Sequence, residues 1–195
     1  AIDRSFDVSG CCSPDPLCCD LGVPLCSIFV HAVSDHAVGE RHGDVDEPFT
    51  LTRTDLDELP EVSIDLDMHC VMTWSAVDTG WTGWKFTEIW ERVLRDRAQR
   101  STTHCVFTGL DGAMASIEVR DLLRDDVMVA HSRDGEVLGR AHGAPYRLVV
   151  PQLYGYKHIK HLCRITLSDH HVRGSHEPWI MHRRGRVAQE ERSGL

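Results

Sequence analysis

The stretch EVSIDLDMHC, residues 61–70, sets the fold class of this chain. Its apolar side chains occupy alternate positions, which is typical of a strand with one buried and one exposed face; these are Val62, Ile64, Leu66 and Met68. Cys70 has the same parity, so a strand that continues to it directs the sulfur toward the buried side. Similar patterns predict further strands at residues 27–33, 104–108, 127–131, 146–151 and 162–168.

Helical patterns are fewer than strand patterns. Residues 85–98 place their apolar side chains on one helical stripe, made of Phe86, Ile89, Trp90, Val93 and Leu94. A short helix is expected over residues 55–59, capped by Thr52 or Thr54 and ended by Pro60. Because the strands outnumber the helices and do not alternate regularly with them, we expect an α+β fold with mixed or antiparallel sheets.

The composition describes one domain with a packed core. The chain has 195 residues, of which 42% are hydrophobic and 26% charged. Residues 1–26 are punctuated by Gly and Pro and are expected to form a Cys-rich N-terminal tail, with residues 27–192 as the domain. No apolar run approaches the roughly 20 residues of a membrane span, and no charged-then-apolar leader precedes Ala1, so we expect a cytoplasmic protein without a membrane span.

Charge is distributed unevenly along the chain. The formal net charge is −9, with −12 in residues 1–70 and +3 in residues 71–195. This balance argues against a nucleic-acid-binding protein, which normally presents a broad basic face. It leaves room for a basic pocket that binds one small anion in the second part of the chain.

The segment Ala141–His161 carries the strongest indication of such a pocket. A Tyr-Gly-Tyr turn at residues 154–156 precedes Lys157 and Lys160, which are two of only three lysines in a chain with 18 arginines. Successive backbone N–H groups beside Arg147 and these lysines are typical of a phosphate site. The alternative is a hairpin whose charges are simply solvated.

Eight cysteines divide into a cluster and three isolated residues. The cluster consists of Cys11, Cys12, Cys18, Cys19 and Cys26. Its CC-x5-CC spacing fits no familiar zinc module, so a tail without a site, a metal site and disulfides all stay open. Of the isolated residues, Cys70 is either a small core residue or a thiolate that acts as nucleophile or metal ligand.

Three segments together resemble a known family. MHCVMTWS (68–75), WTGW (81–84) and HGAPYRLVVPQLYGYKHIKHLCRITL (142–167) resemble the oxidoreductase molybdopterin-binding domain of the sulfite oxidase family, over roughly residues 49–192. The resemblance is to the small haem-free bacterial branch, which is related to the catalytic subunit of methionine-sulfoxide reductase. It implies a mixed β-sheet domain of the sulfite oxidase type that binds a molybdenum–molybdopterin cofactor.

The resemblance also implies an activity and a set of contacts. The activity is two-electron oxygen-atom transfer on a small sulfite- or sulfoxide-like substrate, with electrons exchanged with a separate partner protein. Cys70 is implied as the thiolate ligand of molybdenum, and the backbone of residues 158–160 as the cradle of the pterin phosphate. The cofactor contacts that it implies are Cys70, Thr108, His142, Arg147, His158, Ile159 and Lys160.

Two other functions compete with this one. The first is a metal- or redox-binding module built on the N-terminal cysteine cluster. The second is a domain of the same fold that has lost its cofactor and serves in protein interactions. Molybdenum content and the ultraviolet–visible spectrum of the purified protein separate these possibilities.

Overall fold

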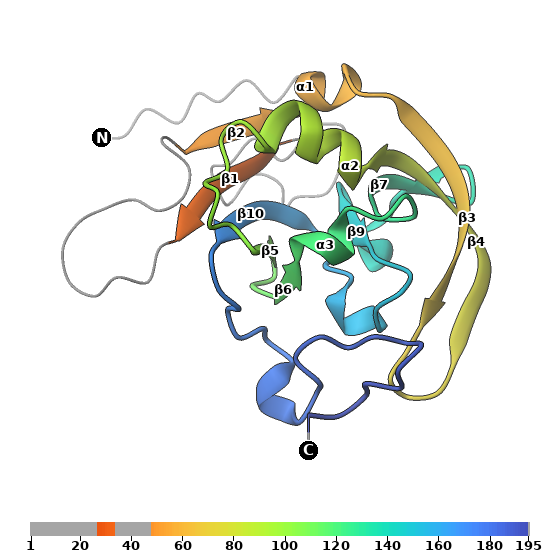
Figure 1. The fold of residues 1–195 in the computed structure, drawn as a ribbon. Coiled ribbons are helices and arrows are strands. Elements are labelled where there is room, and N and C mark those ends of the chain that lie inside the picture. Colours follow the sequence, from red (N-terminus) through yellow and green to blue (C-terminus); the bar gives the residue numbers. More distant parts are fainter. Residues whose placement is uncertain (1–26, 34–47, 195) are drawn as a thin grey trace, which may run out of the picture.

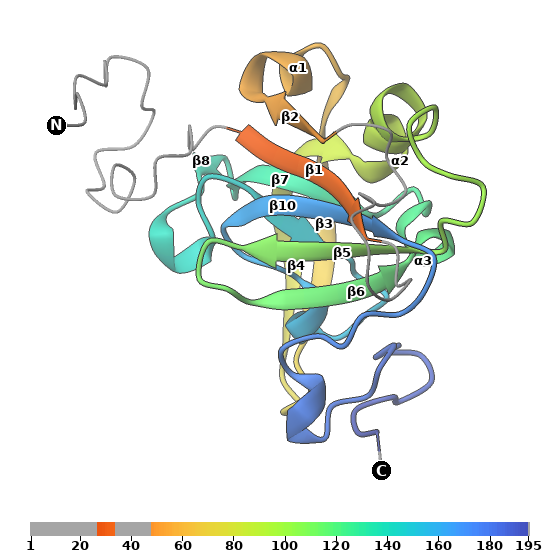
Figure 2. The ribbon, with the colours of Figure 1, turned by 90° about the vertical axis from the view of Figure 1, so that its left-hand side faces the viewer.

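A computed structural model describes residues 27–33 and 48–194 of the chain. Two five-stranded sheets form the body of the molecule, and short helices cover their margins (Figures 1 and 2). One pair of strands is parallel and the others are antiparallel. The expected α+β class with mixed sheets is therefore confirmed, whereas the expected N-terminal tail, residues 1–26, lies outside the described residues.

The first sheet has the strand order β2-β1-β10-β5-β6. Its strands are β1 (Ser27–Val33), β2 (Phe49–Thr52), β5 (His104–Gly109), β6 (Met114–Glu118) and β10 (Leu162–Ser168). The parallel pair is β1 with β10, and Val30 lies opposite Ile165 within it. The strands predicted at residues 27–33 and 162–168 have the predicted bounds.

The second sheet has the order β3-β4-β7-β8, and β9 also pairs with β7. Its strands are β3 (Glu61–His69), β4 (Ser75–Lys85), β7 (Met128–Arg133), β8 (Glu136–Val137) and β9 (Arg147–Val149). Burial alternates along β3 as its sequence predicts, and Cys70 follows directly after its last residue.

The longest described strand, β4, is missing from the strands that the sequence pattern predicted. Its apolar residues do not alternate, because Trp81 and Trp84 are three apart and are both fully buried, one in each of the two apolar clusters. Gly83 permits close pairing with β7, since a Cβ there would lie 2.1 Å from the carbonyl oxygen of Val129. β6 was not predicted either.

The helices are short. In α1 (Arg53–Asp57), Thr52 is the N-cap and forms a capping box with Asp55. The helix predicted at residues 85–98 consists of α2 (Phe86–Ile89) and a π-helical turn, η2 (Trp90–Leu94), so it ends earlier than predicted. The remaining short elements are α3 (Val119–Leu122), η3 (Arg140–His142), η4 (Gly155–Lys157) and η5 (Glu177–Trp179).

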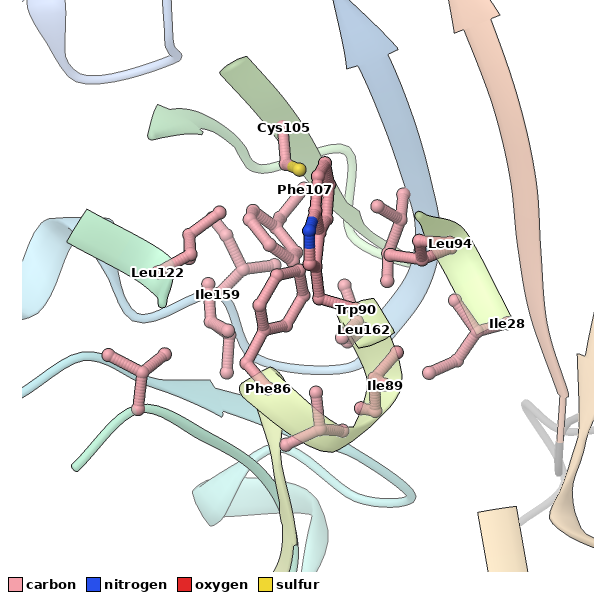
Figure 3. Packing of buried hydrophobic residues seen from close by; sticks show 14 of the residues in the cluster. Ile28, Phe86, Ile89, Trp90, Leu94, Cys105, Phe107, Leu122, Ile159 and Leu162 are labelled. Carbon is pink, nitrogen blue, oxygen red and sulfur yellow. The ribbon is translucent and has the colours of Figure 1, made fainter. Parts of the chain in front are cut away.

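The main core lies between this helical segment and the first sheet. Figure 3 shows the apolar stripe of α2 and η2 directed toward residues of β5 and of the 159–162 segment. Phe86 contacts Phe107 edge to face, with ring centroids 5.6 Å apart. The predicted stripe thus packs against the first sheet.

The chain after β10 runs along the end of the β3–β4 hairpin (Figures 1 and 2). The backbone N–H of Tyr154 donates to the carbonyl of Gly185, and Arg192 donates to the carbonyl of Val71. The C-terminal segment, residues 180–194, therefore contacts both the 154 loop and the turn that carries Cys70. No helix in the described part of the chain is long and apolar enough to cross a membrane.

Candidate functional site

Cys70 lies at the start of a tight turn that joins β3 to β4. Its N–H donates to the carbonyl of Trp74 at 2.9 Å, and its carbonyl accepts from Thr73 at 3.1 Å. The N–H of Met72 points at the Cys70 sulfur from 3.5 Å. The side chain is partly exposed, so its sulfur is accessible and already oriented as an acceptor.

Arg147 contacts the end of β3, two residues before Cys70. One of its terminal nitrogens donates to the sulfur of Met68, whose parity in β3 is that of Cys70, at 3.1 Å. The other donates to the carbonyl of His142 at 3.3 Å, while the buried Nε has no hydrogen-bond partner. Arg147 is only 5% exposed, and no carboxylate contacts it among the described residues.

Three further basic groups surround Arg147. Arg133 places a terminal nitrogen 3.2 Å from Nδ1 of His142, and Lys160 donates to the carbonyl of Ala141 at 2.6 Å. We call Arg133, His142, Arg147 and Lys160 the cation cluster. Among the described residues, its one carboxylate partner is Asp134, which lies 3.1 Å from Nε of Arg133.

Burial and like-charge repulsion together lower the pKa values of Arg147, Lys160 and His142. Burial, together with the charge of Arg133, lowers the pKa of Arg147 to about 10. Burial and the charge of Arg147 also lower the pKa of Lys160. The pKa of His142 is lowered by burial and by the charges of Arg133, Lys160 and Arg147. A bound anion would relieve this repulsion, and a phosphate suits such a cluster of Arg and Lys.

The backbone beside the cation cluster supplies further donors. Within the described residues, the N–H groups of Ile159 and Lys160 have no hydrogen-bond partner. Two glycines pack against this strip, because a Cβ on Gly109 would lie 2.4 Å from the carbonyl oxygen of Lys160 and one on Gly143 would lie 2.8 Å from its Cβ. Gly143 also has φ of 103°, which favours glycine. The two unused N–H groups and the adjacent ammonium fit a phosphate cradle.

The 154–161 loop differs from the sequence prediction at Lys157. This lysine was counted with Lys160 as a phosphate-site charge, but its side chain is 1% exposed and turns into the protein. Its Nζ contacts Glu177 at 3.2 Å, the carbonyl of Ser116 at 3.2 Å and the carbonyl of Arg183 at 2.5 Å. The buried ammonium is stable in this position because a carboxylate and two carbonyls inside the protein pair with it. Lys157 is therefore a structural residue.

His158 and Thr108 occupy different surroundings. The backbone N–H of His158 donates to the carbonyl of Gly155. The buried ring of His158 lies within hydrogen-bond distance of the carbonyls of Val150 and Leu153. His158 therefore holds the loop, and the free donors of the predicted cradle are those of Ile159 and Lys160. Thr108 is partly buried next to Gly109, and its carbonyl accepts from the thiol of Cys163 at 3.4 Å.

Two contacts of this region were missed by the sequence reasoning. Arg133 belongs to the cation cluster, but it lies in β7, far in sequence from Arg147 and Lys160. Arg192 reaches the Cys70 turn from the C-terminal segment. The motifs assigned no role to either residue, and a chain with 18 arginines offers no pattern that singles them out.

The described side chains at this site would hold a metal ion only together with ligands supplied by a cofactor. Within the described residues, no group of three or more His, Cys, Asp or Glu side chains could hold a metal ion. Cys70 supplies one soft sulfur, and the cation cluster with its backbone donors, which contacts β3 at Met68, supplies an anion site. This combination suits a metal that arrives already bound by a phosphorylated organic ligand. The N-terminal cysteine cluster lies outside the described residues.

Comparison with known proteins gives the family. The family model described as oxidoreductase molybdopterin binding domain matches residues 31–176, so the chain belongs to this family. It is a sulfite-oxidase-like oxidoreductase that depends on a molybdopterin-bound molybdenum cofactor.

Curated relatives share a quarter to a third of its residues. The chain is 29% identical over 151 residues to the uncharacterized oxidoreductase YuiH of Bacillus subtilis, covering 77% of this chain and 75% of that one. It is 24% identical to the protein-methionine-sulfoxide reductase catalytic subunit MsrP of Campylobacter jejuni, covering 70% of this chain and 50% of MsrP. It is 28% identical to the mitochondrial sulfite oxidase of Drosophila melanogaster, covering 62% of this chain and 25% of that enzyme.

A solved structure shares the fold. The sulfane dehydrogenase SoxCD of Paracoccus pantotrophus superposes with a TM-score of 0.58 at 19% identity, over 77% of this chain and 39% of the SoxCD chain. The sulfite-oxidase-type architecture predicted from the motifs is therefore confirmed. The chain spans half or less of the methionine-sulfoxide reductase and sulfite oxidase relatives.

Proposed function

We propose that this protein catalyses two-electron oxygen-atom transfer on a small sulfite- or sulfoxide-like substrate at a molybdenum ion ligated by Cys70. One observation carries the proposal: the accessible Cys70 sulfur stands two residues after Met68, whose sulfur accepts a hydrogen bond from Arg147 of the cation cluster. The similarity to a sulfite oxidase and to a methionine-sulfoxide reductase subunit supports the substrate class.

The protein's part in this chemistry is binding and orientation. The bound molybdenum cofactor supplies the two-electron redox change. Arg147 and Lys160, with the N–H groups of Ile159 and Lys160, would hold the pterin phosphate, and His142 would contact the pterin beside Arg133. Thr108 would border the pterin from β5.

The Cys70 turn has the geometry that a ligand loop needs. Its sulfur accepts from the N–H of Met72, and the turn is closed by two backbone hydrogen bonds, so the sulfur is held in place before a metal arrives. The exposed positions that follow Cys70 leave an approach for a small substrate and for a separate electron carrier. The electron carrier and a cytoplasmic location remain part of the proposal.

Elemental analysis and a Cys70→Ser variant test the proposal. Wild-type protein from a molybdate-replete host is expected to contain molybdenum and a thiolate-to-metal absorption band. Cys70→Ser should keep the fold and lose both the band and substrate turnover, because a hydroxyl is a harder and far less acidic ligand. Cys163→Ser is the matched control, since Cys163 is also partly exposed but donates to the Thr108 carbonyl.

Two results would contradict the proposal. Wild-type protein without molybdenum contradicts the cofactor assignment for this chain. A Cys70→Ser variant with an unchanged band and turnover contradicts the ligand assignment alone. Sulfite and small sulfoxides, assayed with artificial electron carriers, would identify the substrate and the direction of the reaction.

A further inference from the structure

Arg192 is the side chain that joins the C-terminal segment to the Cys70 turn. One terminal nitrogen lies 2.9 Å from the carbonyl oxygen of Val71 and 3.5 Å from that of Cys70. The residues are more than a hundred positions apart in the sequence. Among the described residues, Arg192 is the one hydrogen-bond donor to the carbonyl of Val71.

The turn itself needs such a contact. It is closed by the N–H of Cys70 on the carbonyl of Trp74 and by the N–H of Thr73 on the carbonyl of Cys70. Thr73 has φ of 71°, a left-handed conformation that a β-branched residue rarely adopts. Residues 72–75 are exposed, so packing contributes little to holding the turn. A charged hydrogen bond to its carbonyls therefore has a larger share in fixing it.

Arg192 is itself held on a rigid base. Its guanidinium carbon lies 4.9 Å from the ring centroid of Tyr154, which is 1% exposed. Its Nε donates to Glu190 at 2.8 Å, and the hydroxyl of Tyr154 donates to the same carboxylate at 3.4 Å. The backbone of Tyr154 is tied to Gly185 in turn. The guanidinium is thus oriented by stacking on one side and an ion pair on the other before it meets the turn.

We propose that Arg192 is a positioning residue that fixes the Cys70 turn, so that the C-terminal segment sets the orientation of the sulfur toward molybdenum. The inference rests on the proposed role of Cys70 as the ligand. Its neighbours in sequence do not indicate this role, because Arg192 gains it from the path of residues 180–194 past the hairpin end. Arg192 acts through the backbone of Cys70 and Val71, and it touches neither substrate nor metal.

The first test uses the full chain produced in a host that makes no molybdopterin. In Arg192→Met, hydrogen exchange at the amides of Cys70 and Thr73 should rise about tenfold, because one charged hydrogen bond no longer holds the turn. The rate of Cys70 alkylation by iodoacetamide, followed by peptide mass spectrometry against Cys163 as internal reference, should change several-fold. Arg192→Lys should bring both rates part of the way back to the wild-type values. Its ammonium can donate to one carbonyl of the turn but cannot also hold Glu190.

Arg186→Met is the matched control. Arg186 forms an ion pair with Glu191 in the same segment but has no contact with the turn. It should leave exchange and alkylation at Cys70 unchanged. If Arg186→Met has the same effect as Arg192→Met, the segment acts by general packing and the proposal is wrong. Unchanged exchange at both amides in Arg192→Met would overturn it as well.

The second test uses the molybdenum-loaded enzyme. Arg192→Met should shift the thiolate-to-metal absorption band at equal molybdenum content, whereas Arg186→Met should not. A band identical to that of the wild type at equal loading contradicts the orienting role. If the wild type binds no molybdenum, the proposed function fails, while the exchange experiment still decides whether Arg192 holds the turn.

Discussion

Lys157 and Lys160 lie three residues apart in one loop and meet opposite environments. Lys157 is buried against Glu177, which also accepts from His171 at 2.8 Å. Lys160 is exposed and forms no ion pair with a described carboxylate, and its charge adds to that of Arg147. The difference shows how to distinguish a structural charge from one that binds a ligand. A buried cation that is paired with a carboxylate of the protein stabilises the fold. A group of cations with too few carboxylate partners indicates that the protein binds an anion.

The largest expected effect concerns Lys157. Lys157→Met should lower the free energy of unfolding by about 3–5 kcal/mol, because it leaves the mostly buried carboxylate of Glu177 without its cation. Urea denaturation measures this loss. The double variant Lys157→Met with Glu177→Leu should recover much of it, since both charges are then removed. A single variant as stable as the wild type would contradict the structural role of Lys157.

His158 makes the buried half of the loop sensitive to pH. Burial lowers the pKa of His158 to about 4, against about 6.5 for an unfolded histidine. The unfolded chain therefore binds more protons between these values, and stability should fall as the pH drops from about 6.5 to 4, by on the order of 3 kcal/mol. His158→Gln, measured by urea denaturation across this range, should lack that part of the slope. Equal slopes in both proteins would count against it.

Arg147 should show the reverse pattern to Lys157. Arg147→Met should weaken cofactor retention by roughly 10- to 100-fold, as expected when a charged hydrogen bond worth about 1.5–3 kcal/mol is lost. Stability of the cofactor-free protein should stay the same or rise, because the repulsion with Arg133 is removed. Molybdenum content after dialysis and urea denaturation measure the two quantities. Full retention with a large loss of stability would place Arg147 among the structural residues.

Lys160 should give the smallest effect. Lys160→Met is expected to weaken cofactor retention only a few-fold, because its charge is exposed and screened by solvent. The effect should shrink further at high salt, which separates it from the buried contribution of Arg147. Dialysis at low and high ionic strength provides the comparison. A loss as large as that of Arg147→Met, independent of salt, would show that Lys160 is desolvated when the cofactor is bound.

The sequence predicted the fold where local patterns were strong. Alternation identified β3, and helical spacing identified the stripe of α2 and η2, because each pattern requires one buried face. β4 was not predicted, because it contributes Trp81 and Trp84 to different apolar clusters and pairs closely with β7 through Gly83. Apolar residues are therefore buried on both of its faces, and its sequence does not alternate between apolar and polar residues. The bounds of the helix changed because its last turn is a π-helical turn.

The site was predicted unevenly for a similar reason. Cys70, Arg147 and Lys160 stand in segments whose order and spacing carry family information, and the structure brings Arg147 and Lys160 into one cluster. Lys157 was misplaced because its neighbours in sequence say nothing about Glu177, which approaches from the C-terminal region. Arg133 and Arg192 reach the site through pairings between distant strands and segments.

The sequence alone therefore determined the sheet-rich class, the family and the residue types that chemistry with molybdenum needs. Local periodicity and motif order suffice for these, because they depend on neighbouring residues. Only the tertiary structure decided which lysine is compensated, which arginines converge and which side chain fixes the Cys70 turn. A charge is compensated by partners that folding brings from distant parts of the chain. Burial increases the free energy that is gained when a charge is paired and lost when it is not.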